Sequence, residues 1–531
     1  MDVVPWPAKF ADRYRRSGYW RGEPLGGMLA DHVARRPDAT AIIDGDTRWT
    51  YAQVDERADR FASGLAVLGF AAGDRVVVQL PNVAEFVPLL LGLFRLGAVP
   101  VMALPAYRRA EAVHLCRSSG AVAYVVADCE PGSGFDYRVL AGEVTAEAPG
   151  VRQVLVAGDA GPYLPLKDVQ DEPRPLPAPA PDTPALLLVS GGTTGAPKLI
   201  PRTHDDYFYN LRASAQVCGL GEDSVYLAAL PVGHNFPLAC PGVLGTLHSG
   251  GTVVMCRTPS PRAVLAAIEK HRVTCTAAVP PLAAQWAQAA SASRWDLSSL
   301  ELLQVGGARL SVDAAERLVD TFGPVLQQVF GMAEGLLCYT RPGDDMEVIV
   351  GTQGRPLSPD DELRIVDDDD VAVVPGSIGH LLARGPYTIR GYYRAEEYNR
   401  GAFTPDGFYR TGDLVRQTAA GDIVVEGRAK DLVNRAGEKI STDEVQDHLR
   451  SHPAILDAAL VAVPDPRLGE RSCACLVLRD GFDEAPDVVG YLRGRGLADY
   501  KIPDVVRVLP SLPVTAVGKV DKRALASILT S

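Results

Sequence analysis

The sequence predicts an α/β protein: a large N-terminal domain of α/β layers with a β-rich subdomain, then a small C-terminal α+β domain. Three observations lead to this prediction. Apolar strand patterns alternate with helix patterns over most of the N-terminal part, as parallel α/β units require. Short strands with turns replace them over 362–391. Beyond residue 430 the pattern becomes a compact mixture of helix and strand, so we place the domain boundary between 1–429 and 430–531.

Size and composition agree with several domains. A chain of 531 residues is too long for one ordinary hydrophobic core. Apolar residues make up 47% and charged residues 22%, as in a globular protein. The net charge of −12 argues against a nucleic-acid partner. An anionic ligand must therefore be held by local cations and backbone dipoles.

The cysteine pattern and the apolar runs bear on location. The nine cysteines are scattered and contain no C-x-x-C, which favours a reducing cytoplasm over a disulfide framework. The N-terminus lacks an apolar signal core. The longest apolar run, 87–104, is interrupted by Arg95, Gly97 and two prolines, which favours a buried helix and strand. We therefore expect no membrane partner.

The N-terminal elements follow an alternating order. We expect a helix over 25–36, a strand over 41–43, a helix over 51–68, a strand over 74–79, a helix over 87–96 and a strand over 99–104. The same rhythm continues through 116–127 and 151–156, and a proline-rich linker covers 171–185. A second α/β stretch runs over 224–330, and the C-terminal pattern predicts helix 442–451, strands 455–463 and 472–478, helix 488–495 and strand 505–508.

A strand pattern at 186–189 leads into the strongest local signal, the loop 190–195, where two threonines stand among three glycines. Glycines let backbone N–H groups approach a ligand, and hydroxyls together with Lys198 suit an oligophosphate. The spacing does not fit G-x-x-x-x-G-K-[ST], because Pro197 stands at the second glycine and Leu199 follows the lysine. The loop predicts a phosphate site other than a Walker loop, with an ordinary turn as the alternative.

The segment 190–198 resembles the phosphate loop of the adenylate-forming superfamily, [S/T]-G-[G/S]-T-T-G-x-P-K. Six further segments stand in the order of that family, at 306–308, 328–334, 409–413, 427–431, 435–440 and 513–520. Three more, at 199–210, 225–242 and 330–340, look like the stand-alone aryl-acid ligases of siderophore assembly. Those enzymes activate 2,3-dihydroxybenzoate or salicylate.

The resemblance implies an ATP site. The residues it assigns to ATP are Ser190, Gly191, Gly192, Thr193, Thr194, Gly195, Lys198, Gly307, Gln328, Val329, Phe330, Gly331, Asp413, Arg428 and Lys519. Within this set Phe330 would pack on the adenine and Asp413 would take the ribose hydroxyls. Glu334 would bind Mg²⁺, a hard cation that prefers oxygen ligands. Without the resemblance, Phe330 would read equally well as core and Glu334 as a helix cap.

The resemblance also implies an adenylation step that needs no general base. The ionised carboxylate attacks the α-phosphorus, so catalysis consists of positioning and charge neutralisation. The catalytic residues it implies are Lys519, His234, Thr194 and Glu334. Thr193 would share the phosphate contacts of its neighbour.

A second step and a moving domain follow from the same resemblance. The phosphopantetheine thiol of an aryl carrier protein, supplied in trans, would attack the aryl adenylate. The C-terminal domain would be a mobile lid that turns about Lys430, where most family members have aspartate. Its loop with Gly437, Glu438 and Lys439 would then line the thiol tunnel.

The substrate pocket implied by the resemblance consists of His234, Asn235, Phe236, Cys240, Gly306, Gly307, Val329, Gly335 and Leu337. Relatives that take the dihydroxy acid typically have serine and valine where this chain has Cys240 and Leu337. A serine left without the 3-hydroxyl costs roughly 1–3 kcal/mol, whereas a thiol tolerates an apolar ring edge. Both differences favour salicylate. The alternative is that these two residues are core positions without a role in specificity.

Three other functions stay open at this point. A 2,3-dihydroxybenzoate ligase and an aryl-CoA ligase share every adenylation motif, and activity with CoA or with a carrier would separate the latter. An inactive nucleotide-binding protein would keep the fold without catalysis, although Lys519, Asp413 and Glu334 together argue against it. A nicotinamide dehydrogenase is disfavoured, since no G-x-G-x-x-G follows a strand.

Overall fold

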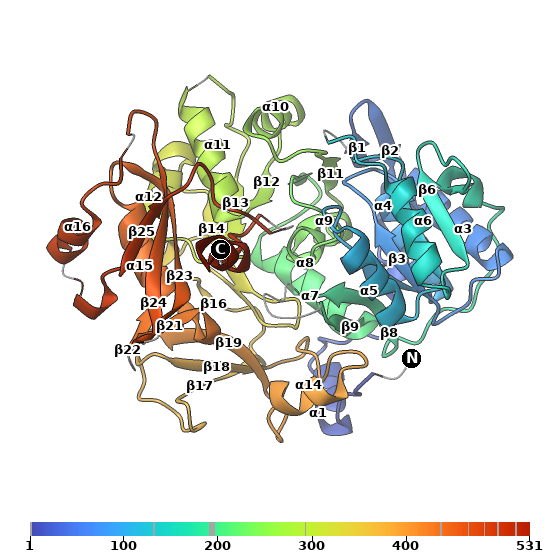
Figure 1. Cartoon of the computed structure of the whole chain (residues 1–531). Helices are drawn as coiled ribbons and strands as arrows, with labels where there is room; N and C mark the ends of the chain where they lie inside the picture. Colours follow the sequence, from blue (N-terminus) through green and yellow to red (C-terminus); the bar gives the residue numbers. More distant parts are fainter. Residues whose placement is uncertain are drawn as a thin grey trace.

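The computed structural model describes residues 3–130, 133–190, 197–292, 294–435, 438–465, 467–482, 484–495, 497, 499–515 and 518–530. Within these residues the chain forms four β-sheets surrounded by helices (Figure 1). Two large sheets belong to the N-terminal part and a four-stranded sheet follows them. A five-stranded sheet belongs to the small C-terminal domain. The predicted α/β class, with a large N-terminal and a small C-terminal domain, is confirmed.

The first large sheet has seven strands. In spatial order they are β7 (Leu164–Pro165), β6 (Gln153–Ala157), β5 (Ala123–Ala127), β3 (Arg75–Gln79), β4 (Val99–Met102), β8 (Pro184–Val189) and β9 (Leu199–Thr203). All neighbours are parallel except β8 and β9. The strands read as continuous apolar runs because helices cover both faces of such a sheet.

The second large sheet has nine strands. They are β16 (Arg355–Pro356), β15 (Leu337–Tyr339), β14 (Leu326–Gly331), β13 (Leu302–Gly306), β12 (Cys275–Ala278), β10 (Val225–Ala228), β11 (Thr252–Met255), β1 (Thr40–Asp44) and β2 (Thr47–Thr50). The strands from β14 to β1 in this order are parallel. The carboxyl ends of β13 and β14 therefore place the loops after Gly306 and Gly331 at one edge, where open α/β sheets bind ligands.

The remaining two sheets are smaller. The four-stranded sheet is antiparallel and consists of β17 (Glu362–Val366), β18 (Gly379–Arg384), β19 (Tyr409–Gln417) and β20 (Ile423–Arg428). The C-terminal sheet consists of β22 (Glu438–Ser441), β21 (Leu432–Arg435), β24 (Gly469–Leu478), β23 (Ile455–Asp465) and β25 (Val505–Val508). It lies at the left of Figure 1.

Seventeen α-helices complete the described residues. They are α1 (Ala8–Arg16), α2 (Ala30–Arg35), α3 (Tyr51–Val67), α4 (Phe86–Leu96), α5 (Arg109–Ser119), α6 (Tyr137–Glu147), α7 (His204–Val217), α8 (Asn235–Ala239), α9 (Gly242–His248), α10 (Pro261–His271), α11 (Pro280–Ala292), α12 (Val312–Phe322), α13 (Met346–Gly351), α14 (Glu396–Ala402), α15 (Thr442–Arg450), α16 (Val488–Gly494) and α17 (Lys522–Thr530). Helices α3 and α4 approach closely at Gly92, where a Cβ would lie 2.8 Å from Phe61 Cβ.

Most of the predicted elements appear within a few residues of their expected bounds, but the helix expected over 25–36 is wrong. The chain forms a 3₁₀ turn, η1 (Leu25–Gly27), and then the separate helix α2. Gly26 and Gly27 weaken a continuous helix, since glycine has poor helix propensity. Gly26 is also packed against Arg95, whose Nε donates to the Gly26 carbonyl at 2.9 Å.

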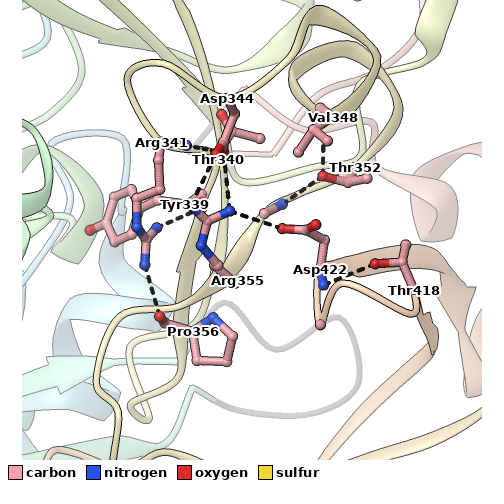
Figure 2. A network of polar contacts seen from close by, with 12 residues as sticks. Tyr339, Thr340, Arg341, Asp344, Val348, Thr352, Arg355, Pro356, Thr418 and Asp422 are labelled. Carbon is pink, nitrogen blue, oxygen red and sulfur yellow. Dashed lines mark hydrogen bonds and ion pairs between the residues drawn. The ribbon is translucent and has the colours of Figure 1, made fainter.

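A polar network joins the four-stranded sheet to the nine-stranded one (Figure 2). Arg355 on β16 lies between two carboxylates, 3.0 Å from Asp344 and 3.4 Å from Asp422 in the turn before β20. Arg341 donates to the carbonyls of Tyr339 and Pro356 at 2.6 and 2.8 Å. The contact between Asp422 and Arg355 ties the start of β20, the strand that carries the predicted nucleotide residue Arg428, to β16.

The helices and the cysteines bear on the expectations about a membrane and about disulfides. Among the described residues, every helix is too short or too polar to span a bilayer. All nine cysteines lie in described segments and are free thiols.

Candidate active site

Two hydrogen bonds between Ser190 and Lys198 close the phosphate loop at its base. Ser190 N–H donates to the Lys198 carbonyl at 2.9 Å, and Lys198 N–H donates to Ser190 Oγ at 2.9 Å. The pair continues the antiparallel ladder of β8 and β9. Lys198 Nζ lies 3.9 Å from the centroid of the Tyr398 ring. The predicted residues Gly191, Gly192, Thr193, Thr194 and Gly195 lie outside the described part of the chain.

Asp413 offers an acceptor of the kind a ribose needs. It is 2% exposed, and its Oδ1 pairs with Arg428 Nε at 2.9 Å. Its Oδ2 is buried without a hydrogen-bond partner among the described residues. Burial raises the pKa of Asp413, while Arg428 and the Thr411 side chain lower it. An orphaned carboxylate oxygen in a buried site fits a ligand hydroxyl, because leaving it unpaired costs free energy.

Glu334 is held in one orientation by a tyrosine. Tyr392 Oη donates to Glu334 Oε1 at 2.7 Å and lies 2.8 Å from Tyr409 Oη. Gly335 has φ +141°, and a Cβ there would lie 2.3 Å from Thr388 Cα, so the turn requires glycine. Among described residues no three His, Cys, Asp or Glu side chains converge, so Mg²⁺ at Glu334 would need further oxygens from the nucleotide or water.

Lys519 of the C-terminal domain reaches the N-terminal site. Its Cε lies 3.6 Å from the position that a Cβ would take on Gly307. Thr515 and Lys519 close the turn, with Thr515 N–H donating to the Lys519 carbonyl at 2.6 Å. Desolvation, with a smaller contribution from Arg428, lowers the pKa of Lys519 to about 8, although Asp413 and Glu334 act to raise it. The four groups therefore lie close enough to interact electrostatically.

His234 and Asn235 form a polar wall at the start of α8. His234 Nδ1 accepts from the Phe236 N–H at 3.2 Å, and burial, with Lys519 adding to it, lowers the pKa of His234 to about 4. The imidazole is therefore neutral at pH 7, and its proton is on Nε2. His234, Asn235, Leu188, Val189 and Ala333 line a small cavity.

Cys240 contacts Asn235 of this wall, whereas Leu337 packs against Gly331, and their role in the acid pocket stays a prediction. Cys240 is 1% exposed, and Asn235 Nδ2 donates to its Sγ at 3.4 Å. Burial raises the pKa of Cys240 to about 12, so it stays a thiol. A Cβ built on Gly331 would lie 2.4 Å from Leu337 Cδ2, so glycine lets the leucine approach β14.

Some of the remaining predicted residues, Phe236, Gly306 and Val329, were assigned to the acid pocket. Phe330 and Gln328 were assigned to the ATP site. Phe236 Cζ lies 3.2 Å, and the Val329 carbonyl oxygen 2.6 Å, from the position that a Cβ would take on Gly306. Phe330 is half-buried at the end of β14. The Gln328 side chain points elsewhere: its Nε2 donates to the Ile349 and Val350 carbonyls and its Oε1 accepts from Gln353. The Gln328 side chain can therefore support a nucleotide only indirectly, by keeping β14 in position.

The predicted hinge and tunnel residues are described in part. Lys430 lies in the 3₁₀ turn η3 (Ala429–Asp431) between β20 and β21. Glu438 and Lys439 begin β22 and pair with Arg435 and Asn434 of β21. Gly437 lies outside the described residues, and the side chains of Lys430, Glu438 and Lys439 also do.

Several residues at the site were not predicted from the sequence. Arg202 is fully buried and pairs with Asp206 at 2.7 Å, Tyr207 donates to Asn235, and Tyr392 holds Glu334. The spacing of Thr203 and Asp206, which form a capping box, could have located the start of α7. No local pattern indicates Tyr392, since its partner is 58 residues away.

One ion pair joins the two domains beside the site. Arg309, two residues after Gly307, pairs with Asp447 on α15 at 3.3 Å. The side chains are 22% and 19% exposed, and burial raises the pKa of Asp447 to about 6 although Arg309 and Arg450 lower it. The pair connects the loop after β13 to the domain that carries Lys519.

We expect Asp447→Asn to lower pyrophosphate exchange about three- to tenfold, since a half-buried pair contributes on the order of 1 kcal/mol to the arrangement with Lys519 in place. Thioester formation from preformed adenylate should not fall. The matched control is Asp457→Asn, which removes a pair with Arg450 at 2.8 Å inside the C-terminal domain. Equal losses in the two variants would contradict a role between the domains.

Comparison with known proteins identifies relatives over the full chain. The sequence profile of the AMP-binding enzyme family matches residues 29–393, and that of the AMP-binding enzyme C-terminal domain matches 444–519. A 2,3-dihydroxybenzoate-AMP ligase of Bacillus subtilis is 54% identical over 99% of this chain and 97% of its own length. A salicyl-AMP ligase / salicyl-S-ArCP synthetase of Mycobacterium tuberculosis is 51% identical over 98% and 94%.

Solved structures show the same fold. The apo structure of Mycobacterium smegmatis MbtA, 52% identical, superposes with a TM-score of 0.78 over 99% of this chain and 98% of that one. ATP-bound MatB from Rhodopseudomonas palustris, only 25% identical, gives 0.86 over 96% and 99%.

Proposed function

We propose that this chain, which belongs to the AMP-binding enzyme family and is an adenylate-forming ligase of aryl acids, activates salicylate and transfers it to a carrier protein. The observation that carries the choice of salicylate is the thiol of Cys240 at the polar wall. A thiol at this predicted pocket position offers a 3-hydroxyl a weaker hydrogen-bond partner than a serine hydroxyl would.

The first half-reaction follows from the charges at the site. Salicylate is ionised at pH 7, and its carboxylate attacks the α-phosphorus of ATP, releasing pyrophosphate. Lys519 would neutralise the negative charge that the carboxylate and the phosphate bring together. The neutral imidazole of His234 would donate a hydrogen bond from Nε2. Asp413 Oδ2 would accept a hydrogen bond from a ribose hydroxyl. Glu334 would hold Mg²⁺, which when bound supplies positive charge to the phosphates.

The second half-reaction would load the aryl group on a thiol. A phosphopantetheine thiol of a carrier protein in trans attacks the acyl carbon of the adenylate, AMP leaves, and a thioester forms. The names of two relatives differ in the acid but agree in AMP ligation, and one names a carrier-bound product. We place the enzyme in the cytoplasm and its product in siderophore assembly. An aryl-CoA ligase is the second candidate, and loading of holo-carrier against CoA separates the two.

Selectivity tests the choice of acid. We expect salicylate to exceed 2,3-dihydroxybenzoate in kcat/KM by about ten- to two-hundredfold, because a 3-hydroxyl beside Cys240 and Leu337 loses water without a good partner. Cys240→Ser with Leu337→Val should narrow or invert this ratio. We expect the two side chains to border one pocket, so their effects should not be additive. Pyrophosphate exchange with both acids measures the ratio.

Cys116→Ser controls for the effect of introducing a hydroxyl at a buried position. Cys116 lies on α5 and is about as buried as Cys240. This variant should leave the ratio unchanged. A wild-type preference for the dihydroxy acid would contradict the choice of salicylate, while absence of exchange with every aryl acid would contradict the proposed reaction.

A further inference from the structure

We propose that Tyr207 determines which ortho substituent the acid pocket accepts, by holding the Asn235 amide so that one of its two N–H groups stays free for the substrate. The proposal rests on the proposed function and adds a positioning residue to it. Tyr207 itself would not touch the acid. It acts through Asn235, and the substituent it selects is a hydrogen-bond acceptor such as the 2-hydroxyl oxygen.

The tyrosine is fixed before any substrate binds. It lies on α7, is fully buried and donates from Oη to Asn235 Oδ1 at 2.9 Å. The Arg202 guanidinium lies 4.8 Å from the centroid of its ring. Arg202 is itself held by Asp206 at 2.7 Å and by the Ala333 carbonyl at 3.0 Å. The hydroxyl therefore has little freedom to find another acceptor.

The hydroxyl proton determines the orientation of the amide. Asn235 Oδ1 is the acceptor that the described residues give to Tyr207 Oη. If the amide turned by 180°, the hydroxyl would face N–H₂ and its proton would be buried without an acceptor. A buried hydroxyl proton without an acceptor costs free energy, so the turned state is disfavoured.

The contacts of Cys240 are consistent with the same orientation of the Asn235 amide. Its Sγ receives a hydrogen bond from Asn235 Nδ2 at 3.4 Å, and its own S–H donates to the Asn235 carbonyl at 3.5 Å. One amide proton of Asn235 is thus used by sulfur and the other is left for the cavity, which Asn235 lines together with His234. Because His234 carries its proton on Nε2, both polar groups of this wall are donors.

A wall of donors discriminates between ortho groups. The oxygen of a 2-hydroxyl accepts readily, and its own proton can bond to the neighbouring carboxylate. The nitrogen of a 2-amino group is a poor acceptor, because its lone pair is delocalised into the ring, and its N–H groups would face other N–H groups. Salicylate should therefore be favoured over anthranilate, whereas benzoate has no ortho group to be tested.

Tyr207→Phe removes the proton that fixes the amide and keeps the ring. We expect the ratio of kcat/KM for salicylate over anthranilate, measured by pyrophosphate exchange, to fall about tenfold, with benzoate changing less than about twofold. Tyr209→Phe is the matched control on the same helix. Its hydroxyl donates to Ser358 Oγ at 2.8 Å, away from Asn235, and its loss should leave the ratio unchanged.

A second variant keeps the test independent of the folding of the first. Asn235→Asp replaces the N–H₂ donor by an acceptor, so the same ratio should fall even if all acids bind less well. Equal losses for salicylate, anthranilate and benzoate in Tyr207→Phe would reduce Tyr207 to packing and overturn the proposal. A wild-type enzyme that exchanges with none of these acids would instead contradict the proposed function.

Discussion

Lys519→Ala is expected to lower adenylate formation by about three orders of magnitude or more while leaving the fold intact. The side chain enters the N-terminal site beside Gly307, close enough to Arg428, Asp413 and Glu334 to interact with them. It is the cation best placed to neutralise a carboxylate that approaches the α-phosphate. Pyrophosphate exchange with salicylate measures the loss, and thermal unfolding checks the fold.

The same variant should form thioester from preformed aryl adenylate much better than it forms adenylate, because the C-terminal domain would have turned Lys519 out of the site. Lys501→Ala is the matched control. Lys501 lies in the same domain and pairs with Glu444 at 2.7 Å. Equal loss of both half-reactions in Lys519→Ala would contradict an arrangement in two conformations.

The pH dependence gives an independent measurement on the same lysine. Desolvation lowers the pKa of Lys519 to about 8, so the free enzyme loses this positive charge as the pH rises through that value. The kcat/KM for adenylation should therefore fall above about pH 8. His234 has a pKa near 4 and stays neutral throughout, so it should not add a titration between pH 6 and 8.

Local patterns predicted the sheet-forming segments well and the long-range contacts poorly. The strand, helix and strand at β3, α4 and β4 follow from apolar runs that report burial directly. The break between η1 and α2 was missed, since a helix pattern does not show where glycines will pack against Arg95. The apolar runs are local and can be read from neighbouring residues. The break depends on a contact with a residue far along the chain, so a local pattern does not show it.

The same limit applies to the site. Cys240 and Asn235 lie five residues apart, so their nearness is visible in the sequence. The partners that orient them come from other elements: Tyr207 is 28 residues from Asn235, and Tyr392 is 58 from Glu334. The fold brings such pairs together through sheet order and helix packing, which periodicity in a single sequence does not encode.

Lys430→Pro is expected to separate the two half-reactions. The residue lies in the turn η3 between Arg428, whose φ is −115°, and Leu432, whose φ is −78°. Proline holds φ near −65°, which a 3₁₀ turn accepts, so the arrangement with Lys519 in the site should survive. A rotation of the C-terminal domain about this residue would require a different φ, and proline forbids it.

Pyrophosphate exchange by Lys430→Pro should therefore stay within about threefold of the wild type, while loading of the holo-carrier drops by about a hundredfold or more. Lys430→Ala is the control for loss of the charge and should leave both activities nearly unchanged. If the proline variant loads the carrier normally, the rotation takes place elsewhere than at residue 430. If exchange and loading fall together at an unchanged melting temperature, the turn itself is needed for adenylation, because Arg428 stands directly before it and its pairing with Asp413 would be disturbed.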